Sequence, residues 1–293
     1  MGDIKAPENY EDLIRLIHDR HDDMSKTYQK ISVYLTQNPN EVAVKPVNAI
    51  SELCGIHASS FVRFAQSLGY TGFKDLQFLF QKRLTTAAPG FESRREALDR
   101  EIKLREGQSG LSFLRDLIVQ DIASLEDLLE NTDQDDISKA ADHIASAKTV
   151  YILGQLRSAP VADLMRYMLT MLGKPCVLLD ASGGLATHIA NTIGDDDVLI
   201  AISFRFYANE VVNIAETVAK AKVPIIAISD STLSPLAKSA DVLFAVPERD
   251  YSFSRSLTAP ICLAQALTVA VAAQIQNDPS APRIPTVTEN ADK

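Results

Sequence analysis

Five short apolar runs in the second half of the chain constrain its fold more than any other feature. Their residues are apolar almost throughout, without the alternation typical of a strand that has one face in water. Helical patterns separate the runs, and strands of this kind joined by helices form parallel sheets covered on both faces. The sequence therefore predicts an α/β domain with a mainly parallel five-stranded sheet flanked by helices. The runs are TVYIL (149–153), PCVLLD (175–180), DVLIAIS (197–203), VPIIAIS (223–229) and DVLFAV (241–246).

The first 84 residues follow a different pattern, that of short helices. Apolar residues recur at helical spacing in 10–20, and the next helical stretch starts after Ser25 and stops at Asn38 and Pro39. We divide the chain into an all-α DNA-binding domain, a polar linker, an α/β effector-binding domain and a disordered tail. The boundaries of these four parts are 1–84, 85–110, 111–280 and 281–293.

The charge of the chain is uneven along its length. The net charge is −9, from 29 Lys and Arg against 38 Asp and Glu. Residues 1–110 hold 15 of each sign, so the remaining 14 basic and 23 acidic residues place all of the excess in 111–293. A local basic face at 58–84, from Arg63, Lys74, Lys82 and Arg83, fits a phosphate backbone.

The three cysteines and the chain's start bear on its compartment. Cys54, Cys176 and Cys262 are far apart with no Cys-x-x-Cys pair, which favours reduced thiols and a cytoplasmic protein over a disulfide framework or a zinc site. The N-terminus shows no signal-peptide pattern, and no metal or cofactor is expected. The apolar stretch 257–276 is interpreted as a buried helix that contributes to a subunit contact, not as a membrane span.

A helix-turn-helix is predicted at 48–69, NAISELCGIHASSFVRFAQSLG. Ile50 and Leu53 are expected on the inner face of its first helix, and Gly55 permits a left-handed turn above Ile56. Phe61, Phe64 and Leu68 on the second helix should pack inward. The residues expected to meet DNA face outward near the start of that helix or follow it: His57, Ala58, Ser59, Ser60, Arg63 and Lys74. The alternative is an ordinary helical hairpin, with His57 as a helix-start residue.

This segment resembles the helix-turn-helix of RpiR-type transcriptional regulators, and the resemblance continues for about 280 residues. The family's second helix carries Val-Ser-x-x-Thr-Val-x-Arg-Phe and then Leu-Gly-Phe/Tyr-x-Gly-Tyr/Phe. Arg63, Phe64, Gly69 and Gly72 match, while His57 stands where the family has serine. Further matching residues are Ile56, Ser60, Val62, Leu68, Tyr70 and Phe73. The resemblance implies a DNA-binding regulator.

Loops that carry serine follow the first four predicted strands. The carboxyl ends of parallel strands meet at one edge of a sheet, where helix N-termini favour anions. We therefore expect a pocket for an anionic effector there. Each serine alone is accounted for equally well as a helix cap. The predicted effector-binding residues are Ser158, Ser182, Ser203, Arg205, Tyr207 and Ser229.

This half looks like a SIS (sugar isomerase) domain, the sensor module of RpiR-type regulators. The family binds phosphosugars through a Ser-x-Ser-Gly-x-Thr loop after the third strand. Here Ser203 matches the first serine, Arg205 and Phe206 replace Ser-Gly, and Ala208 replaces threonine. A subset of RpiR-type proteins carries a similar SFRxY loop. We interpret it as a rebuilt anion site, with a sugar phosphate ahead of a carboxylate. The alternative is that Arg205 pairs with a neighbouring acid, such as Glu210, and does not meet the ligand.

Two other functions compete with a regulator. A sugar-phosphate isomerase needs a base, for which the sheet domain offers Glu210, His143 and His188. Glu210 is interpreted as a helix N-terminal residue favoured by the helix dipole, and an enzyme leaves the helical domain unexplained. A dinucleotide sensor would use Asp180 as its ribose-binding acid, but GQLRSA after Gly154 lacks the glycines of G-x-G-x-x-G. We conclude that the chain is a cytoplasmic regulator, not an enzyme, that binds operator DNA as a homodimer or homotetramer.

Overall fold

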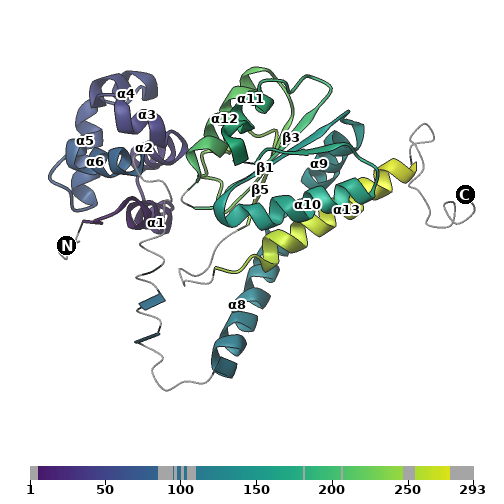
Figure 1. Ribbon diagram of the computed structural model, residues 1–293. Coiled ribbons are helices and arrows are strands. Elements are labelled where there is room, and N and C mark those ends of the chain that lie inside the picture. The colour runs from purple at the N-terminus through teal and green to yellow at the C-terminus, as the bar shows by residue number, and fades with distance from the viewer. Residues whose placement is uncertain are drawn as a thin grey trace, which may run out of the picture.

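The computed structural model describes residues 6–84, 95, 98–99, 102–103, 110–180, 182–205, 207–246 and 255–277. These residues form a helical body at the N-terminal end and an α/β body, which lie side by side (Figure 1). Most of the predicted linker 85–110 and all of the predicted tail 281–293 lie outside the described residues. The boundaries proposed for them stay predictions.

The helical body is built from short amphipathic helices around one core. They are α1 (Tyr10–Arg20), α2 (Lys26–Gln37), α3 (Pro39–Val44), α4 (Val47–Cys54), α5 (Ala58–Ser67) and α6 (Phe73–Leu84). Asn9 caps α1 by accepting a hydrogen bond from the Asp12 amide at 2.8 Å, and Ser25 accepts one from the Tyr28 amide at 3.3 Å. Pro39 opens α3, where its missing N–H leaves no bond unmade. The predicted helix start at Ser25 and the predicted stop at Asn38 and Pro39 are therefore confirmed for α2.

Helices α4 and α5 form the predicted helix-turn-helix. Gly55 ends α4 with φ of 62°, a left-handed conformation that costs glycine little. Phe61, Phe64 and Leu68 are buried as expected. Leu53 differs from the expectation, because its side chain is 59% exposed.

The inner face of α4 explains where Leu53 lies. Val47, Ile50 and Cys54 contact the core, and their spacing of three and four residues defines one helical stripe. Position 53 stands beside that stripe at the solvent side. An eight-residue helix buries only a narrow face, so Leu53 is left outside it.

All five predicted strands are present and every pairing is parallel, in the order β2-β1-β3-β4-β5. Val150 of β1 is in register with Cys176 of β2 and Val198 of β3. The chain therefore moves from β1 to one edge and then returns to β3 on the other side of β1, which makes the β1–β3 junction a topological switch point. The strands are β1 (Val150–Gly154), β2 (Cys176–Leu178), β3 (Val198–Ile202), β4 (Ile225–Ser229) and β5 (Val242–Ala245).

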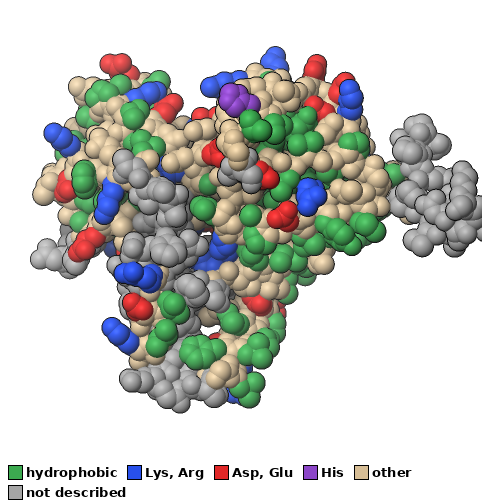
Figure 2. All heavy atoms as spheres, in the orientation of Figure 1, with side chains coloured by type: hydrophobic (Ala, Val, Ile, Leu, Met, Phe, Trp, Pro, Cys, Tyr) green, Lys and Arg blue, Asp and Glu red, His purple; other side chains and the backbone are tan. Residues whose placement is uncertain are grey.

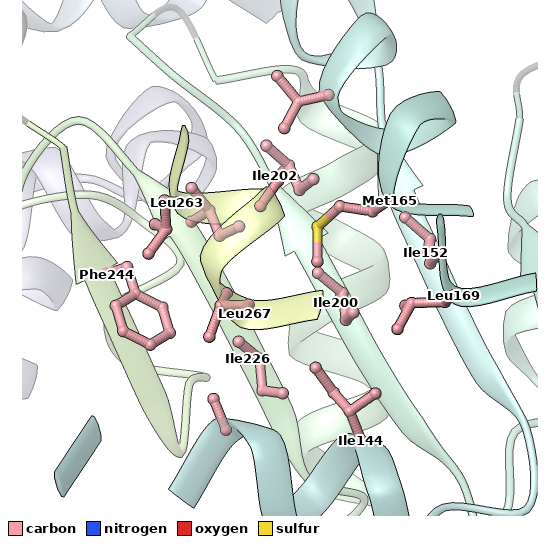
Figure 3. Packing of buried hydrophobic residues seen from close by; sticks show 14 of the residues in the cluster. Ile144, Ile152, Met165, Leu169, Ile200, Ile202, Ile226, Phe244, Leu263 and Leu267 are labelled. Atoms are coloured by element: carbon pink, nitrogen blue, oxygen red, sulfur yellow. The ribbon is translucent and has the colours of Figure 1, made fainter. Parts of the chain in front are cut away.

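Helices cover both faces of this sheet, which is why the strands lack polar alternation. Ile152, Ile200 and Ile226 point to one face of the sheet, where helices α10 and α13 complete the core (Figure 3). The helix side chains in this core include Met165 and Leu169 of α10 and Leu263 and Leu267 of α13. Alternate strand residues point to the other face, against α11 and α12. The helices are α8 (Gly110–Glu130), α9 (Gln134–Ser146), α10 (Ala159–Met171), α11 (Ala186–Ala190), α12 (Asn209–Lys220) and α13 (Thr258–Asn277), with short 3₁₀ turns η1 (Leu156–Ser158) and η2 (Ser182–Gly184).

Helix α13 is the apolar stretch that the sequence predicted as a buried helix. It is long and apolar enough to cross a membrane by length and composition. Its side chains Leu263, Leu267 and Val271 are nevertheless buried in the core beneath the sheet. That is the position of a core helix in an α/β domain.

Helix α8 extends away from the α/β body and contacts α13 near one end (Figure 1). Its exposed side carries large apolar residues, and apolar side chains gather along this projecting limb in the space-filling view (Figure 2). We call this surface the α8 stripe. Its members, with their exposed fractions, are Leu111 (65%), Leu114 (52%), Ile118 (49%), Val119 (60%) and Ile122 (51%).

Candidate functional site

A cavity lies at the switch point, between the loop after β1 and the loop after β3. It encloses about 350 Å³ of space, a figure that includes open solvent. Ligands of open α/β sheets bind at this position, outside the carboxyl ends of the strands. The lining residues are Gln155, Leu156, Arg157, Ser158, Ser203, Phe204, Arg205, Tyr207, Ala208 and Arg255.

The first loop of the cavity is tightly built against helix α10. A Cβ at Gly154 would stand 2.8 Å from the Cβ of Ala162 and 3.0 Å from the Ser158 carbonyl oxygen, so only glycine allows this approach. Leu156 has φ of 54°, a left-handed conformation that is rare and strained for a leucine. Together these features bring the buried Ser158 to the start of α10, beside the cavity.

Arg157 crosses the cavity from the first loop to the second. Its guanidinium carbon lies 4.9 Å from the centroid of the Phe204 ring, in a cation–π arrangement. Nη1 donates to the carbonyl oxygens of Arg255 and Ser256, both at 3.3 Å. The segment before α13 is thereby held against the two strand-end loops.

Arg205 is the centre of a buried polar cluster. Its Nε donates to Oδ2 of Asp230 at 3.4 Å, and the two side chains are 6% and 0% exposed. Its Nη2 donates to Nδ1 of His18 on α1, also at 3.4 Å. Burial lowers the pKa of His18 to about 4, and the neighbouring Arg205 cation lowers it as well. His18 is therefore uncharged at neutral pH and accepts the bond from Arg205.

Ser203 and Ser229 connect the ends of β3 and β4 instead of both lining the cavity. The Ser229 hydroxyl donates to the Ser203 carbonyl oxygen at 2.6 Å and lies 2.7 Å from the Ser234 hydroxyl. Ser203 lines the cavity, while Ser229 is fully buried and its hydroxyl is used inside the protein. The sequence grouped the two serines because both end a strand, but it could not show which way each hydroxyl points.

Tyr207 lines the cavity from a buried position. Burial raises the pKa of Tyr207 well above its ordinary value, and the carboxylate of Asp230 raises it further, so the hydroxyl keeps its proton. The Tyr207 carbonyl oxygen accepts a hydrogen bond at 2.7 Å from Nη2 of Arg83, at the end of α6. Arg83 is 3% exposed, which corrects its expected place on the basic DNA-facing surface. It binds the neighbouring domain instead.

The alternative in which Arg205 pairs with a neighbouring acid is confirmed as to the pairing. Glu210, the acid named as the example, is engaged elsewhere. Its Oε2 accepts from Nε2 of Gln155 at 2.5 Å and its Oε1 from the Thr187 hydroxyl at 3.4 Å. The partner of Arg205 is Asp230, which directly follows Ser229 in the sequence.

The described lining of the cavity contains no carboxylate and no histidine. His143 lies on α9, the exposed His188 on α11, and the exposed Asp180 follows β2. Ser182 begins η2, but its side chain and the whole of Phe206 lie outside the described residues. Within the part of the chain that the structure describes, no group of acidic, histidine or cysteine residues could hold a metal ion.

Sequence reasoning missed Arg157, Arg255, Asp230 and His18. Arg157 stood in the quoted loop GQLRSA, directly before the predicted Ser158, and its place at a strand end was a usable signal. Arg255 follows the last strand by ten residues, and His18 belongs to the other domain. No local pattern connects either of them to this site.

The second candidate surface is the outward side of α5. His57, Ser59 and Arg63 are exposed, and Ala58 and Ser60 are partly exposed near the start of the helix. Lys74 is exposed on α6. The structure thus brings the six predicted DNA-facing residues to the surface of the helical body, with α5 on the side away from the α/β body (Figure 1).

A helix-turn-helix joined to a parallel α/β sensor with a polar cavity at its switch point defines a class of protein, the two-domain transcriptional regulators. Family models agree for both parts. Residues 11–87 match the helix-turn-helix domain of the rpiR family, and residues 143–270 match the SIS domain. The chain belongs to the RpiR family of helix-turn-helix transcriptional regulators, and its α/β body is a SIS domain.

Relatives with the same arrangement extend over most of the chain. An uncharacterized HTH-type transcriptional regulator of Thermotoga maritima is 24% identical over 240 residues, 82% of each chain. The HTH-type transcriptional regulator HexR of Pseudomonas aeruginosa is 22% identical over 242 residues, 81% of this chain and 79% of HexR.

Two solved structures share the fold. The sugar isomerase domain of an RpiR transcription factor from Sphaerobacter thermophilus covers 54% of this chain and 89% of its own, with a TM-score of 0.52 and 27% identity. The Vibrio vulnificus NanR protein, solved in complex with ManNAc-6P, covers 90% and 92%, with a TM-score of 0.52 and 15% identity.

Proposed function

We propose that this regulator responds to a small anionic metabolite held in the switch-point cavity. The observation that carries the proposal is the chemistry of the lining. Arg157, Arg205 and Arg255 approach one space together with Ser158 and Ser203, and no described carboxylate lines it. Guanidinium groups bind carboxylates and phosphates through paired donors, and the start of α10 adds the favourable end of a helix dipole.

A sugar phosphate is the first candidate effector, and a carboxylate is the second. The SIS fold and the NanR structure with ManNAc-6P support the sugar phosphate. The replacement of the family's Ser-Gly pair by Arg205 and Phe206 supports a ligand whose anionic group binds a guanidinium instead of a ring of hydroxyls and amides.

For DNA, we propose that α5 enters the major groove of the operator. His57, Ala58, Ser59 and Ser60 at its start are small or polar and allow close approach to base edges, while Arg63 supplies a cation. Lys74 on α6 would contact the phosphate backbone beside the groove.

We further propose that the regulator assembles as a homodimer or homotetramer through the α8 stripe, with a second copy of the chain as its partner. Helix-turn-helix proteins bind paired half-sites as dimers, and a projecting helix with five large apolar side chains in water needs a cover. Helix α13, expected at the subunit contact, packs much of its apolar surface in its own core and exposes Val269. Ile118→Asp should therefore dissociate the assembly in sedimentation measurements, and Val269→Asp should not.

The protein is proposed to be a cytoplasmic regulator without catalytic activity. Aldose–ketose isomerisation needs a base within reach of the sugar carbons, and the described lining of the cavity provides none. Tyr207 also lines the cavity. Its hydroxyl keeps its proton because burial raises its pKa. Residues 111–280 should fold, assemble and bind the effector without the helical domain.

A thermal-shift screen of sugar phosphates, carboxylates and matched neutral sugars tests the function. A ligand that binds only the folded state raises the melting temperature. We expect anionic compounds to do so, and their addition to change binding to an operator selected from random DNA. If only neutral or cationic compounds stabilise the protein, the proposed effector class is wrong.

A further inference from the structure

The loop that lines the effector cavity is also the loop that holds the DNA-binding domain. Behind the cavity, the loop after β3 meets α1 through the Arg205–His18 bond and α6 through the Arg83–Tyr207 bond. These contacts join residues 187 and 124 positions apart in the sequence. The two domains therefore touch at the place where an effector would bind.

Arg83 is positioned for this contact by its own domain. Its guanidinium carbon lies 5.2 Å from the centroid of the Tyr10 ring, which in turn packs edge-on against Phe80 at 5.1 Å. Nη1 donates to Asn40 at 2.8 Å, and Nη2 reaches the Tyr207 carbonyl oxygen. The Arg83 side chain is buried and contacts both the β3 loop and the core of the helical domain. A movement of the β3 loop would therefore act directly on that core.

Further polar contacts extend the same interface away from the cavity. Asn40 donates to Asn213 at 3.0 Å, Lys238 donates to Asn38 at 2.7 Å, and Gln37 donates to the Thr232 carbonyl oxygen at 3.4 Å. All three of these contacts are hydrogen bonds between polar groups. An interface of this kind between domains of one chain is suited to opening and closing.

We propose that Arg205 is shared by the effector and the DNA-binding domain, so that an anion bound in the cavity weakens the contact with α1 and loosens the DNA-binding domain. The binding half of this inference rests on the proposed function. Arg205 lines the cavity and at the same time donates to His18. An anion that draws the guanidinium toward the cavity would therefore compete with His18.

The strengths of the competing bonds give the direction of the effect. His18 offers a neutral ring nitrogen at 3.4 Å, near the long limit for a hydrogen bond. An anionic oxygen adds the attraction between opposite charges to the hydrogen bond from the guanidinium cation, which the uncharged His18 ring does not supply. Arg205 should therefore turn toward the anion and leave His18.

The expected consequence for DNA is a change in the placement of α5. That helix lies on the side of its domain away from the SIS domain, so the interface does not cover it (Figure 1). In a dimer, two such helices must match the spacing of the half-sites. When α1 separates from the β3 loop, the distance between the two α5 helices is no longer fixed. By reciprocity, binding to DNA that requires the docked arrangement should weaken anion binding.

The test is a phosphate titration of the full chain with His18→Ala. His18 does not line the cavity, yet its loss removes a competitor for Arg205. Loss of one hydrogen bond as long as 3.4 Å corresponds to a gain of about two- to tenfold in affinity for inorganic phosphate, measured by calorimetry. His188→Ala, which removes an exposed histidine on α11, is the matched control and should bind phosphate as the wild type does. Equal or weaker binding by His18→Ala overturns the proposal.

Hydrogen exchange provides a readout that separates this proposal from the proposed function. Saturating phosphate should raise amide exchange in α1 of the wild type, and unchanged exchange despite bound phosphate overturns the coupling while leaving the effector site intact. If phosphate does not bind, the cavity is not a site for that anion. The exchange measurement without ligand then tests the role of Arg205 at the domain interface. In that measurement His18→Ala and Arg205→Lys should each raise exchange in α1, and no change in either variant overturns the shared role of Arg205.

Discussion

Replacing Asp230 by asparagine should reduce stability and strengthen anion binding at once. Asp230 is fully buried and carries the negative charge that faces the buried guanidinium of Arg205 at 3.4 Å. Removing one partner of a buried pair costs about 3–5 kcal/mol, because the other charge stays buried without compensation. Asparagine keeps an oxygen that can accept one bond, which offsets about 1 kcal/mol. The expected loss is therefore about 2–4 kcal/mol.

Denaturant unfolding measures this loss as a shift in midpoint at unchanged slope. The matched control is Asp163→Asn, whose partner Arg166 is 3.7 Å away in a pair with side chains 47% and 56% exposed. An exposed pair of this kind contributes about 0–1 kcal/mol. With phosphate present, Asp230→Asn should regain part of its stability, because the anion supplies the missing negative charge. A loss no larger than that of the control would refute the assignment of Asp230 as the counter-charge.

Three further outcomes follow from individual positions. Gly154→Ala should destabilise the fold by about 1–3 kcal/mol in denaturant unfolding, since the new Cβ would meet the Cβ of Ala162 at 2.8 Å, whereas Gly72→Ala has nothing within 4 Å and should not show this clash. The pKa of His18 in the folded protein is about 4, below its ordinary 6.5, so the unfolded chain takes up a proton first and stability should fall as the pH drops from about 6.5 to about 4. His18→Gln should flatten this dependence of stability on pH, and an unchanged slope would contradict the lowered pKa. Arg63→Ala should weaken operator binding by about 1–3 kcal/mol if the arginine contacts a base. If the arginine contacts phosphate, the affinities for operator and non-specific DNA should fall equally, and the salt slope should shrink by about one. Unchanged affinity for both kinds of DNA would exclude α5 from the groove.

The secondary structure could be predicted because its signals are local. The runs ending at Leu153, Ser203 and Ser229 are apolar almost throughout, and only a sheet covered on both sides accepts such strands. Gly55 between two apolar helical stripes likewise specified the turn of the helix-turn-helix. These features depend on residues within a few positions of one another, so the sequence alone is sufficient.

The partners within the site could not be predicted, because they depend on how distant segments meet. Asp230 was visible directly after β4, but its pairing with Arg205 requires β3 and β4 to be neighbours in the sheet. Arg83 was expected at the DNA surface from its basic surroundings, yet the docking of two domains buries it against Tyr207. Side-chain direction decided the rest, as the inward hydroxyl of Ser229 illustrates.

The central claim is that Arg205 binds an anionic effector in the switch-point cavity, and calorimetric titration of Arg205 variants tests it most directly. The ligand is the compound that most stabilises the wild type in the thermal-shift screen. A charge-assisted contact contributes about 1.5–3 kcal/mol, so Arg205→Ala should weaken binding about ten- to a hundredfold. Arg205→Lys retains the charge opposite Asp230 but not the two-pronged geometry, and should recover only part of the loss. Equal affinities in the wild type and both variants would contradict the account.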